Sequence, residues 1–259
     1  MINAFYKKYQ KHFDVSENNF AHFVMWSCGG ICIGFVIGLV GIAFHLALEW
    51  ATEFRTAHPM LLWLLPFGGL AIVLAYRLAG QEKDRGTNFI LVAVRANEAV
   101  TLRTAPLIFF STVVTHLLGG SAGREGAALQ LGGSIASSFG RIFQLNEREG
   151  RIMTMCGMAA GFAALFGTPL TSVIFAMEVI TVGVMHYSAI VPCIISALVA
   201  AGLSQAVGIA PTTFSIAHIP ATVGLENCFR AAVLGVLCAV LSVLFCIVME
   251  HVGGAYRRI

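Results

Sequence analysis

The chain has 259 residues, of which 58% are hydrophobic and only 11% charged, and its mean hydropathy is +0.82. Ordinary soluble domains are about half apolar and about a quarter charged, so this composition excludes a water-soluble domain and predicts an integral membrane protein. The formal net charge of +3 does not indicate nucleic-acid binding, because most Lys and Arg residues lie between the apolar runs.

Six apolar runs are candidates for membrane segments. About 20 helical residues, at ~1.5 Å each, cross the ~30 Å hydrocarbon layer. The runs cover residues 23–50, 60–79, 105–118, 152–166, 170–207 and 230–252, and the third and fourth are too short to span alone. The first run follows a mostly polar segment and is about twice as long as the apolar part of a secretory signal, so we expect it to stay in the membrane. Residues 1–22 are then a cytoplasmic or interfacial N-terminal segment, and residues 23–259 the transmembrane domain.

Within the first run, Gly30, Gly34 and Gly38 recur every four residues. This spacing lines one helix face with small residues and predicts a seam where another helix approaches closely. His45 and Glu49, near the end of the run, are interpreted as interfacial residues that reach toward headgroups.

The basic residues predict the orientation. Loops on the cytoplasmic side of a membrane carry an excess of Lys and Arg. Residues 211–227 contain no Lys or Arg, and this loop is expected outside the cell. We therefore expect a multi-pass protein of the cell membrane with both termini cytoplasmic, and the aromatic, basic stretch 5–20 as an inner interfacial helix. The basic residues that flank the runs are Lys7, Lys8, Lys11, Arg77, Lys83, Arg85, Arg257 and Arg258.

Between residues 80 and 170 the chain is interrupted repeatedly by Gly and Pro, in "DRGTNF", "RTAP", "GGSAGREG" and "FGTPL". Irregular backbone at membrane depth is tolerated only where protein buries it or where it lines a watery cavity. The pattern predicts an all-α fold with broken, re-entrant helices around an internal site.

That site is expected to bind an anion. The first N–H groups of a helix lack intrahelical partners and carry partial positive charge. "GGSAGREG" precedes a segment able to continue as a helix, and "RGTN" precedes another. We expect half-length helices that begin near Thr87 and Gly126, with converging N-termini. The candidate anion-binding residues are Gly86, Thr87, Asn88, Gly123, Arg124, Gly126 and Ala127.

Glu125 is the candidate gate. Its carboxylate resembles an anion, so it can occupy the anion position when ionised and leave it when protonated. The alternative is that Arg124 and Glu125 form an ion pair at the membrane boundary, which is weakened because adjacent helical residues do not face each other.

Other chemistry finds little support. None of the seven cysteines forms a CxxC pair, and we interpret them as small packing residues without a disulfide or metal role. A nucleotide phosphate loop at "GGSAGREG" would need a Lys-Ser/Thr ending or an acidic partner about 20 residues further on, and neither is present. The sequence thus indicates neither an enzyme nor a cofactor.

Two motifs resemble the CLC family of chloride channels and proton-coupled anion exchangers. "GREGA" at 123–127 is similar to the family's GREGP, with Ala127 in place of proline, and "LQLGGSIA" to its continuation. Residues 157–179 resemble the segment G-x-A-A-G-x-A-A-x-F-x-x-P-L-x-G-x-x-F-x-x-E. The matching residues there are Gly157, Gly161, Phe166, Pro169, Phe175 and Glu178.

The resemblance implies a chloride or fluoride channel or anion/proton antiporter, gated by Glu125. It also implies a homodimer formed through residues 170–207. Small residues suited to that packing are Ser188, Ala189, Ser196, Ala197, Ala200 and Ala201.

"GTNFIL" is closer to the G-M-N-L-I-L loop of the fluoride/proton antiporter branch than to the common GSGIP, although Thr87 replaces its methionine. Exchangers of the chloride branch often carry an acidic pair where this chain has Glu178 and Val179, so the inner proton relay is missing there. In the fluoride branch that acid lies elsewhere in the second half.

A CLC subunit combines two inverted halves, and this chain resembles the first half plus the first helix of the second. No second copy of the broken-helix pattern follows Val252. The sequence is a piece of a longer chain, a truncated gene product, or a half completed by a second chain, and of these we favour the first. The alternative function is a non-transporting membrane scaffold or half-subunit.

Overall fold

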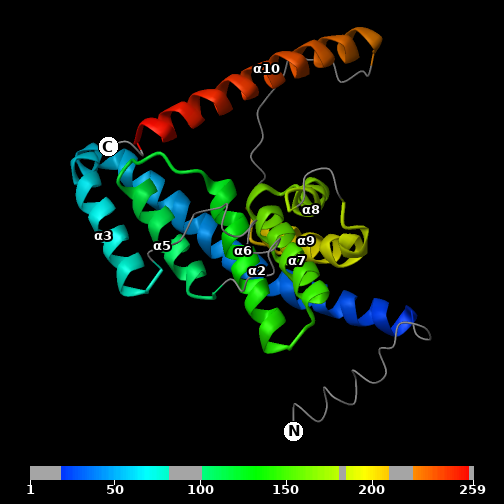
Figure 1. Cartoon of the computed structure of the whole chain (residues 1–259). Helices are drawn as coiled ribbons and strands as arrows, with labels where there is room; N and C mark the ends of the chain where they lie inside the picture. Colours follow the sequence, from blue (N-terminus) through cyan, green and yellow to red (C-terminus); the bar gives the residue numbers. More distant parts are fainter. Residues whose placement is uncertain (1–18, 82–100, 181–184, 210–223, 257–259) are drawn as a thin grey trace. The chain divides into compact units, whose positions relative to one another are not determined.

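The computed structural model describes residues 19–81, 101–180, 185–209 and 224–256, and every regular element among them is a helix (Figure 1). This confirms the predicted all-α fold. The helices are α2 (Asn19–Ala57), η1 (Pro59–Leu64), α3 (Leu65–Leu78), α5 (Thr104–Leu117), α6 (Arg124–Ile142), α7 (Glu147–Phe166), α8 (Pro169–Glu178), η2 (Tyr187–Ala189), α9 (Ile190–Ala206) and α10 (Leu225–Tyr256). The chain forms two compact units, Met1–Thr212 and Thr213–Ile259.

Four helical segments are long and apolar enough to cross a membrane: Phe23–Ala57, Pro59–Leu78, Tyr187–Ala206 and Leu225–Ala255. Helix α5 has 14 residues and α8 has 10, so α5 is as short as its apolar run predicts. Two lengths differ from expectation. Helix α7 reaches 20 residues because a polar first turn precedes the apolar run. Helix α6 has 19 residues and is longer than the half-helix expected at this place.

The predicted glycine seam is confirmed, and its partner is α9. A Cβ atom added to Gly30 would lie 2.9 Å from the Pro192 carbonyl oxygen, and one added to Gly34 would lie 2.5 Å from that of Ser196. At Gly38 the Cα of Ala200 would be 3.1 Å away. The contact positions rise together along both helices, so α2 and α9 run in the same direction, with their backbones close to each other.

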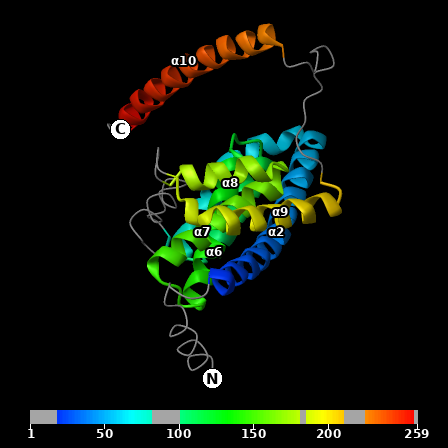
Figure 2. The same ribbon diagram turned by 90° about the vertical axis from the view of Figure 1, so that its right-hand side faces the viewer.

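Helix α7 packs against both α2 and α9 (Figure 2). The Ser196 hydroxyl donates to the carbonyl oxygen of Cys156 at 3.0 Å, and the Ser204 hydroxyl donates to that of Ala164 at 2.8 Å. Ala164 also faces Gly41 of α2, where an added Cβ would lie 2.7 Å from the Ala164 Cβ. Polar hydroxyls inside a membrane bundle hold helices together in this way, because lipid offers them no partner.

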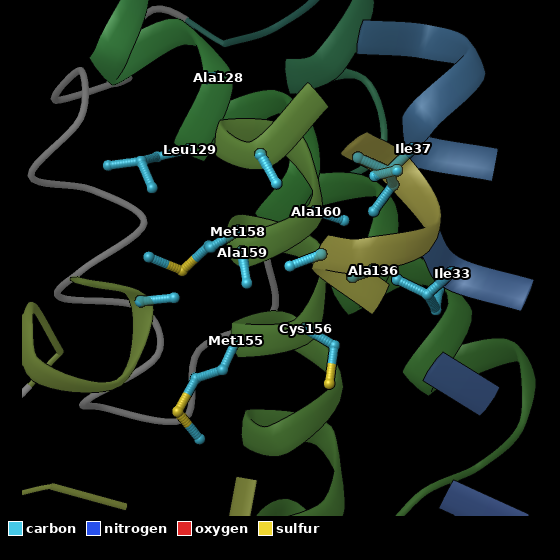
Figure 3. Packing of buried hydrophobic residues seen from close by; sticks show 14 of the residues in the cluster. Ile33, Ile37, Ala128, Leu129, Ala136, Met155, Cys156, Met158, Ala159 and Ala160 are labelled. Carbon is cyan, nitrogen blue, oxygen red and sulfur yellow. The ribbon is translucent and has the colours of Figure 1, made fainter. Parts of the chain in front are cut away.

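Helix α6 packs antiparallel against α7 with glycine on both sides of the crossing. A Cβ on Gly132 would lie 2.1 Å from the Gly157 carbonyl oxygen, and one on Gly161 would lie 2.7 Å from that of Ala128. The buried side chains around this crossing form the core of the first unit. Figure 3 shows Ala128, Leu129 and Ala136 of α6, Met155, Cys156, Met158, Ala159 and Ala160 of α7, and Ile33 and Ile37 of α2.

The expected use of small residues in a dimer interface is wrong for most of them. Ala189, Ser196, Ala197 and Ala200 are fully buried inside the chain, and Ala201 is 5% exposed. They face α2 and α7, because the small-residue face of α9 meets the glycine seam. Of the six residues named, Ser188 is the one exposed side chain.

Helices α3 and α5 complete the arrangement as an antiparallel pair. A Cβ on Gly68, near the start of α3, would meet Leu118 at the end of α5. At the other end, the Gln81 side-chain amide donates to the Thr101 hydroxyl at 3.0 Å, just before α5 begins. A Cβ added to Gly119, just after α5, would lie 3.3 Å from the Cδ of Arg55 near the end of α2. Since α6 also runs against α7, the end of α5 and the start of α6 lie on the side where α2 ends.

Candidate functional site

The connection between α5 and α6 is held in place by the corner between α2 and η1. Gly119 adopts a left-handed φ of +81°, a conformation that costs glycine little. A Cβ there would lie 3.0 Å from Leu62 and 3.3 Å from the Cδ of Arg55. At Gly120 an added Cβ would lie 2.6 Å from the Thr115 methyl group. The start of "GGSAGREG" therefore packs closely against η1, α2 and α5.

Helix α6 starts at the end of this connection, which confirms the predicted helix N-terminus and places it two residues before Gly126. Gly123 is the N-cap, with extended backbone angles of −77° and 145°, and Arg124 is the first helical residue. Because glycine has no side chain, the first N–H groups of α6 receive no cap from this residue.

The Glu125 side chain folds back over the N-cap. Its Oε2 atom would lie 3.0 Å from a Cβ on Gly123, and Glu125 belongs to the first turn of α6. The carboxylate thus lies beside the positive end of the helix, where negative charge is stabilised.

Burial changes sharply along the site. Gly123 and Glu125 are exposed, Arg124 and Gly126 are half-buried, and Ala127 is 7% exposed.

Within the part of the chain that the structure describes, Arg124 and Glu125 form no ion pair with each other. The ion-pair alternative therefore finds no support in this geometry.

The sequence analysis missed a row of buried polar side chains along α6. Gln130, Ser134 and Ser138 are all buried. The Ser134 hydroxyl donates to the Gln130 carbonyl oxygen, and the Ser138 hydroxyl donates to that of Ser134 at 2.9 Å. Arg141 donates from Nη2 to the Ser138 hydroxyl at 3.0 Å. Their spacing of four residues was the available signal. The row carries hydroxyl groups from the middle of α6 to its C-terminal end.

The remaining expected residues fall into two groups. Gly86, Thr87 and Asn88 lie outside the described residues, so the convergence of the two helix starts stays a prediction. The motif residues 157–178 mainly build the scaffold: Gly157 and Gly161 permit the α6–α7 crossing, and the Phe162 ring packs at a tilt against Phe166 and Phe175 at centroid distances of 4.5 and 5.3 Å. Glu178 ends α8 with an exposed side chain.

Metal ligands add no further site to the described part of the chain. The described residues contain no group of three or more His, Cys, Asp or Glu side chains that could hold a metal ion. The thiols of Cys156 and Cys193 lie 3.7 Å apart in the core, between α7 and α9.

The described residues form a bundle of membrane-length and shortened helices with a glutamate in the first turn of a glycine-capped helix, which agrees with the membrane transport protein expected from the sequence. The family profile described as voltage gated chloride channel matches residues 67–259. The chain therefore belongs to the CLC family, whose members are ion channels and transporters and not enzymes.

Individual relatives agree with this assignment. The chain is 36% identical over 228 residues to the chloride/fluoride channel protein of Pseudomonas syringae pv. tomato, covering 88% of this chain and 50% of the relative. It is 34% identical over 160 residues to the H+/Cl− exchange transporter ClcA of Cronobacter sakazakii, covering 56% and 34%. The chain spans half or less of the length of these curated relatives.

Two solved structures share the fold. The crystal structure of a CLC-type fluoride/proton antiporter aligns with a TM-score of 0.72 and 33% identity, over 81% of this chain and 52% of that one. A slow cyanobacterial Cl−/H+ antiporter aligns with a TM-score of 0.61 at 21% identity, over 83% and 54%. The all-helical fold with membrane-length apolar helices that the sequence predicts thus matches a solved CLC structure over about half of that chain.

Proposed function

We propose that this chain forms the first half of a CLC-type halide transporter, in which Glu125 is the gating glutamate. The observation that carries the proposal is the position of the Glu125 carboxylate, folded back over the glycine-capped start of α6. The names of the relatives, a chloride/fluoride channel and a fluoride/proton antiporter, supply the substrate class. Chloride or fluoride and protons are the proposed partners.

The helix directions support a proposal for the side of the membrane on which Glu125 lies. Helix α6 starts on the side where α2 ends, so Glu125 lies on the side opposite the N-terminus. The basic residues before α2 predict a cytoplasmic N-terminus. Glu125 then faces the outside and responds to external protons: when ionised it covers the helix start, and when protonated it releases that position to a halide ion.

Arg124 has a supporting role in this proposal. It is half-buried at the first position of α6, and a fixed guanidinium in direct contact with the ion would bind it too tightly for release. Arg124 raises the local positive potential and steadies the loop, while backbone N–H groups of residues 124–127 provide the weaker contacts that transport requires.

The chain provides one wall of the pathway. In transporters built from inverted repeats, the substrate site lies at the interface of the repeats. The alternative of a non-transporting scaffold makes a distinct prediction: purified protein would move neither halide nor protons across a lipid bilayer.

Proteoliposomes test both functions. Vesicles loaded with fluoride or chloride are followed with an ion electrode for halide release and a pH dye for coupled proton movement. The full-length protein, in which both halves of the pathway are present, is expected to move both ions. Glu125→Gln mimics the protonated gate, so halide movement should persist while proton movement falls to the level of empty vesicles. Glu53→Gln, which removes an exposed carboxylate at the end of α2, serves as the matched control and should match wild type.

Two results would contradict the proposal. Proton movement in Glu125→Gln equal to that of wild type would remove Glu125 from the gate. Inert full-length protein that is nevertheless folded, as judged by a monodisperse chromatographic peak, would favour the scaffold. The ratio of fluoride to chloride release in the wild-type protein separates the two halides, which the relatives' names leave open.

A further inference from the structure

Two cysteine side chains touch inside the core of the first unit. The Cys193 thiol, near the start of α9, donates a hydrogen bond to the sulfur of Cys156 in the middle of α7, and the two Sγ atoms are 3.7 Å apart. Both side chains are fully buried, and Cys156 belongs to the core cluster shown in Figure 3. The other five cysteines are exposed: Cys28, Cys32, Cys228, Cys238 and Cys246. Burial thus distinguishes this pair from the remaining thiols.

The backbones of the two cysteines are fixed relative to each other by Ser196. Its hydroxyl oxygen lies 3.0 Å from the Cys156 carbonyl oxygen and 3.0 Å from the Cys193 carbonyl oxygen. One hydroxyl group therefore bridges the two main chains beside the thiol pair. A disulfide requires close backbones, with Cα atoms about 4.4–6.8 Å apart. The Ser196 bridge keeps α7 and α9 close at the level where the thiols meet.

Little movement separates the two thiols from a covalent bond. Bonded sulfurs are about 2.05 Å apart, so each sulfur would move by about 0.8 Å from its present position. Rotation of two side chains about their Cα–Cβ bonds supplies a displacement of this size. The helices themselves can stay where the Ser196 bridge holds them.

We propose that Cys156 and Cys193 are an oxidative modification site, at which hydrogen peroxide joins α7 to α9 through a disulfide. First, the sulfur of one thiol attacks a peroxide oxygen and the O–O bond breaks, which gives a sulfenic acid and one water molecule. Next, the second sulfur attacks the sulfenic sulfur, the S–O bond breaks, and a second water molecule leaves with the thiol proton. Both cysteines are oxidised, and the peroxide is reduced to water.

Burial determines both the oxidant and the product. A single buried thiol is ordinarily inert, but here the sulfenic acid already touches its reaction partner, so no further molecule has to enter. Hydrogen peroxide is small and uncharged, whereas glutathione is large and charged and does not fit a packed apolar core. The expected product is therefore the disulfide and not a glutathione adduct. For the same reason the disulfide should resist reduction by glutathione.

This modification would add a covalent role to two residues for which the sequence suggested only packing. The bond would close the stretch of chain between residues 156 and 193, which includes α8. Closing such a loop restricts the unfolded chain and should raise the melting temperature of the oxidised protein. The site involves neither Glu125 nor the start of α6, so its test does not depend on transport.

Peptide mapping of the full-length protein tests the proposal. Exposed thiols are first blocked with iodoacetamide in the folded protein, hydrogen peroxide is added, and the protein is then denatured and cut with chymotrypsin. Cleavage after Phe162, Phe166 and Tyr187 places Cys156 and Cys193 on separate peptides, which stay joined only through a disulfide. The expected result is the joined pair, with a mass lower than the sum of the two peptides by two hydrogen atoms.

The digest carries its own control for the oxidant. Met60 is 79% exposed, and its conversion to the sulfoxide shows that peroxide has acted. Sulfoxide at Met60 without the joined peptide pair in wild-type protein would overturn the proposal, and this result requires no variant to fold. Added glutathione should leave the bond intact, while an uncharged trialkylphosphine should break it. A glutathione adduct on Cys156 or Cys193 would also overturn the proposal, because it would show that large reagents reach the pair.

Two variants connect the bond to stability. Cys156→Ala removes one partner, so the joined peptides should fall to the level of an untreated sample and peroxide should no longer raise the melting temperature. Cys28→Ala, at an exposed thiol of α2, is the matched control and should behave as wild type in both measurements. An equal rise of the melting temperature in Cys156→Ala and wild type would contradict the assignment, since other oxidised residues would then cause it.

Discussion

At Gly132 and Gly157 two helix backbones touch with no side chain between them. The atoms that an added Cβ on Gly132 would meet are the carbonyl oxygen and carbon of Gly157, at 2.1 and 2.8 Å. Backbone atoms cannot rotate away as the end of a flexible side chain can. The sequence indicated that glycine mattered at residue 157 through the family motif, but neither the motif nor composition identified Gly132 as its partner, because helix crossings depend on tertiary packing.

We expect Gly157→Ala to destabilise the fold by roughly 1–3 kcal/mol, the usual cost of forcing a methyl group into a packed site. Thermal unfolding in detergent, followed by intrinsic fluorescence or by loss of the monodisperse peak, measures the effect. Gly202→Ala in α9 is the matched control, because nothing lies within 4 Å of its added Cβ. That variant should be neutral or slightly stabilising, since alanine favours helix. Equal stability of the two variants would contradict the close crossing.

Helix α7 is the element on which the others converge, since α2, α6, α8 and α9 all contact it. Its start is set by a capping box: the Glu149 N–H donates to the Asn146 side chain at 2.9 Å, and the Asn146 N–H donates to the Glu149 carboxylate at 3.1 Å. Gly167 ends it with a left-handed φ of 65°. Both signals were readable in the sequence, but the apolar run alone placed the start too late, because the first turn is polar.

Asn146→Ala should lower stability by about 1 kcal/mol, within the range of 0.5–2 kcal/mol seen for lost N-caps. Asn146→Asp keeps an oxygen acceptor at the cap and should stay close to wild type. The melting temperatures of the three proteins in the same detergent give the comparison. If alanine and aspartate lowered stability equally, the side-chain cap would have no role at this helix start.

Across the whole first unit, three parallel helices, α2, α7 and α9, share one direction, and α6 runs against them. The sequence predicted the seam of Gly30, Gly34 and Gly38 but assigned the small residues of α9 to a partner subunit. Small residues indicate that a backbone comes close, without indicating which one. The homodimer stays a prediction, and its surface must use other residues, such as the exposed Leu170 and Leu198.

The shared direction of α2 and α9 yields a prediction about topology. Helix α9 ends on the side where α2 ends, and α10 is long enough to cross once more. Both chain ends should then lie in the cytoplasm, with the loop of residues 211–227 outside. Green fluorescent protein fused after Ile259 should fluoresce in bacterial cells, and alkaline phosphatase inserted after Thr212 should be active. The reverse pair of signals would place the protein upside down relative to the positive-inside rule.

The contact between Gly132 and Gly157 and the contact between Gly34 and Ser196 can form at different times during synthesis. Gly132 and Gly157 lie close in the sequence, so the α6–α7 hairpin can close as soon as both helices have left the ribosome. Gly34 must wait for Ser196, about 160 residues later, which at about 5–20 residues per second is roughly ten to thirty seconds. During that interval α2 holds its glycine face open to lipid or to the insertion machinery. The glycine face of α2 thus meets α9 long after α2 itself has been made, although α5 and α7 reach other parts of α2 earlier.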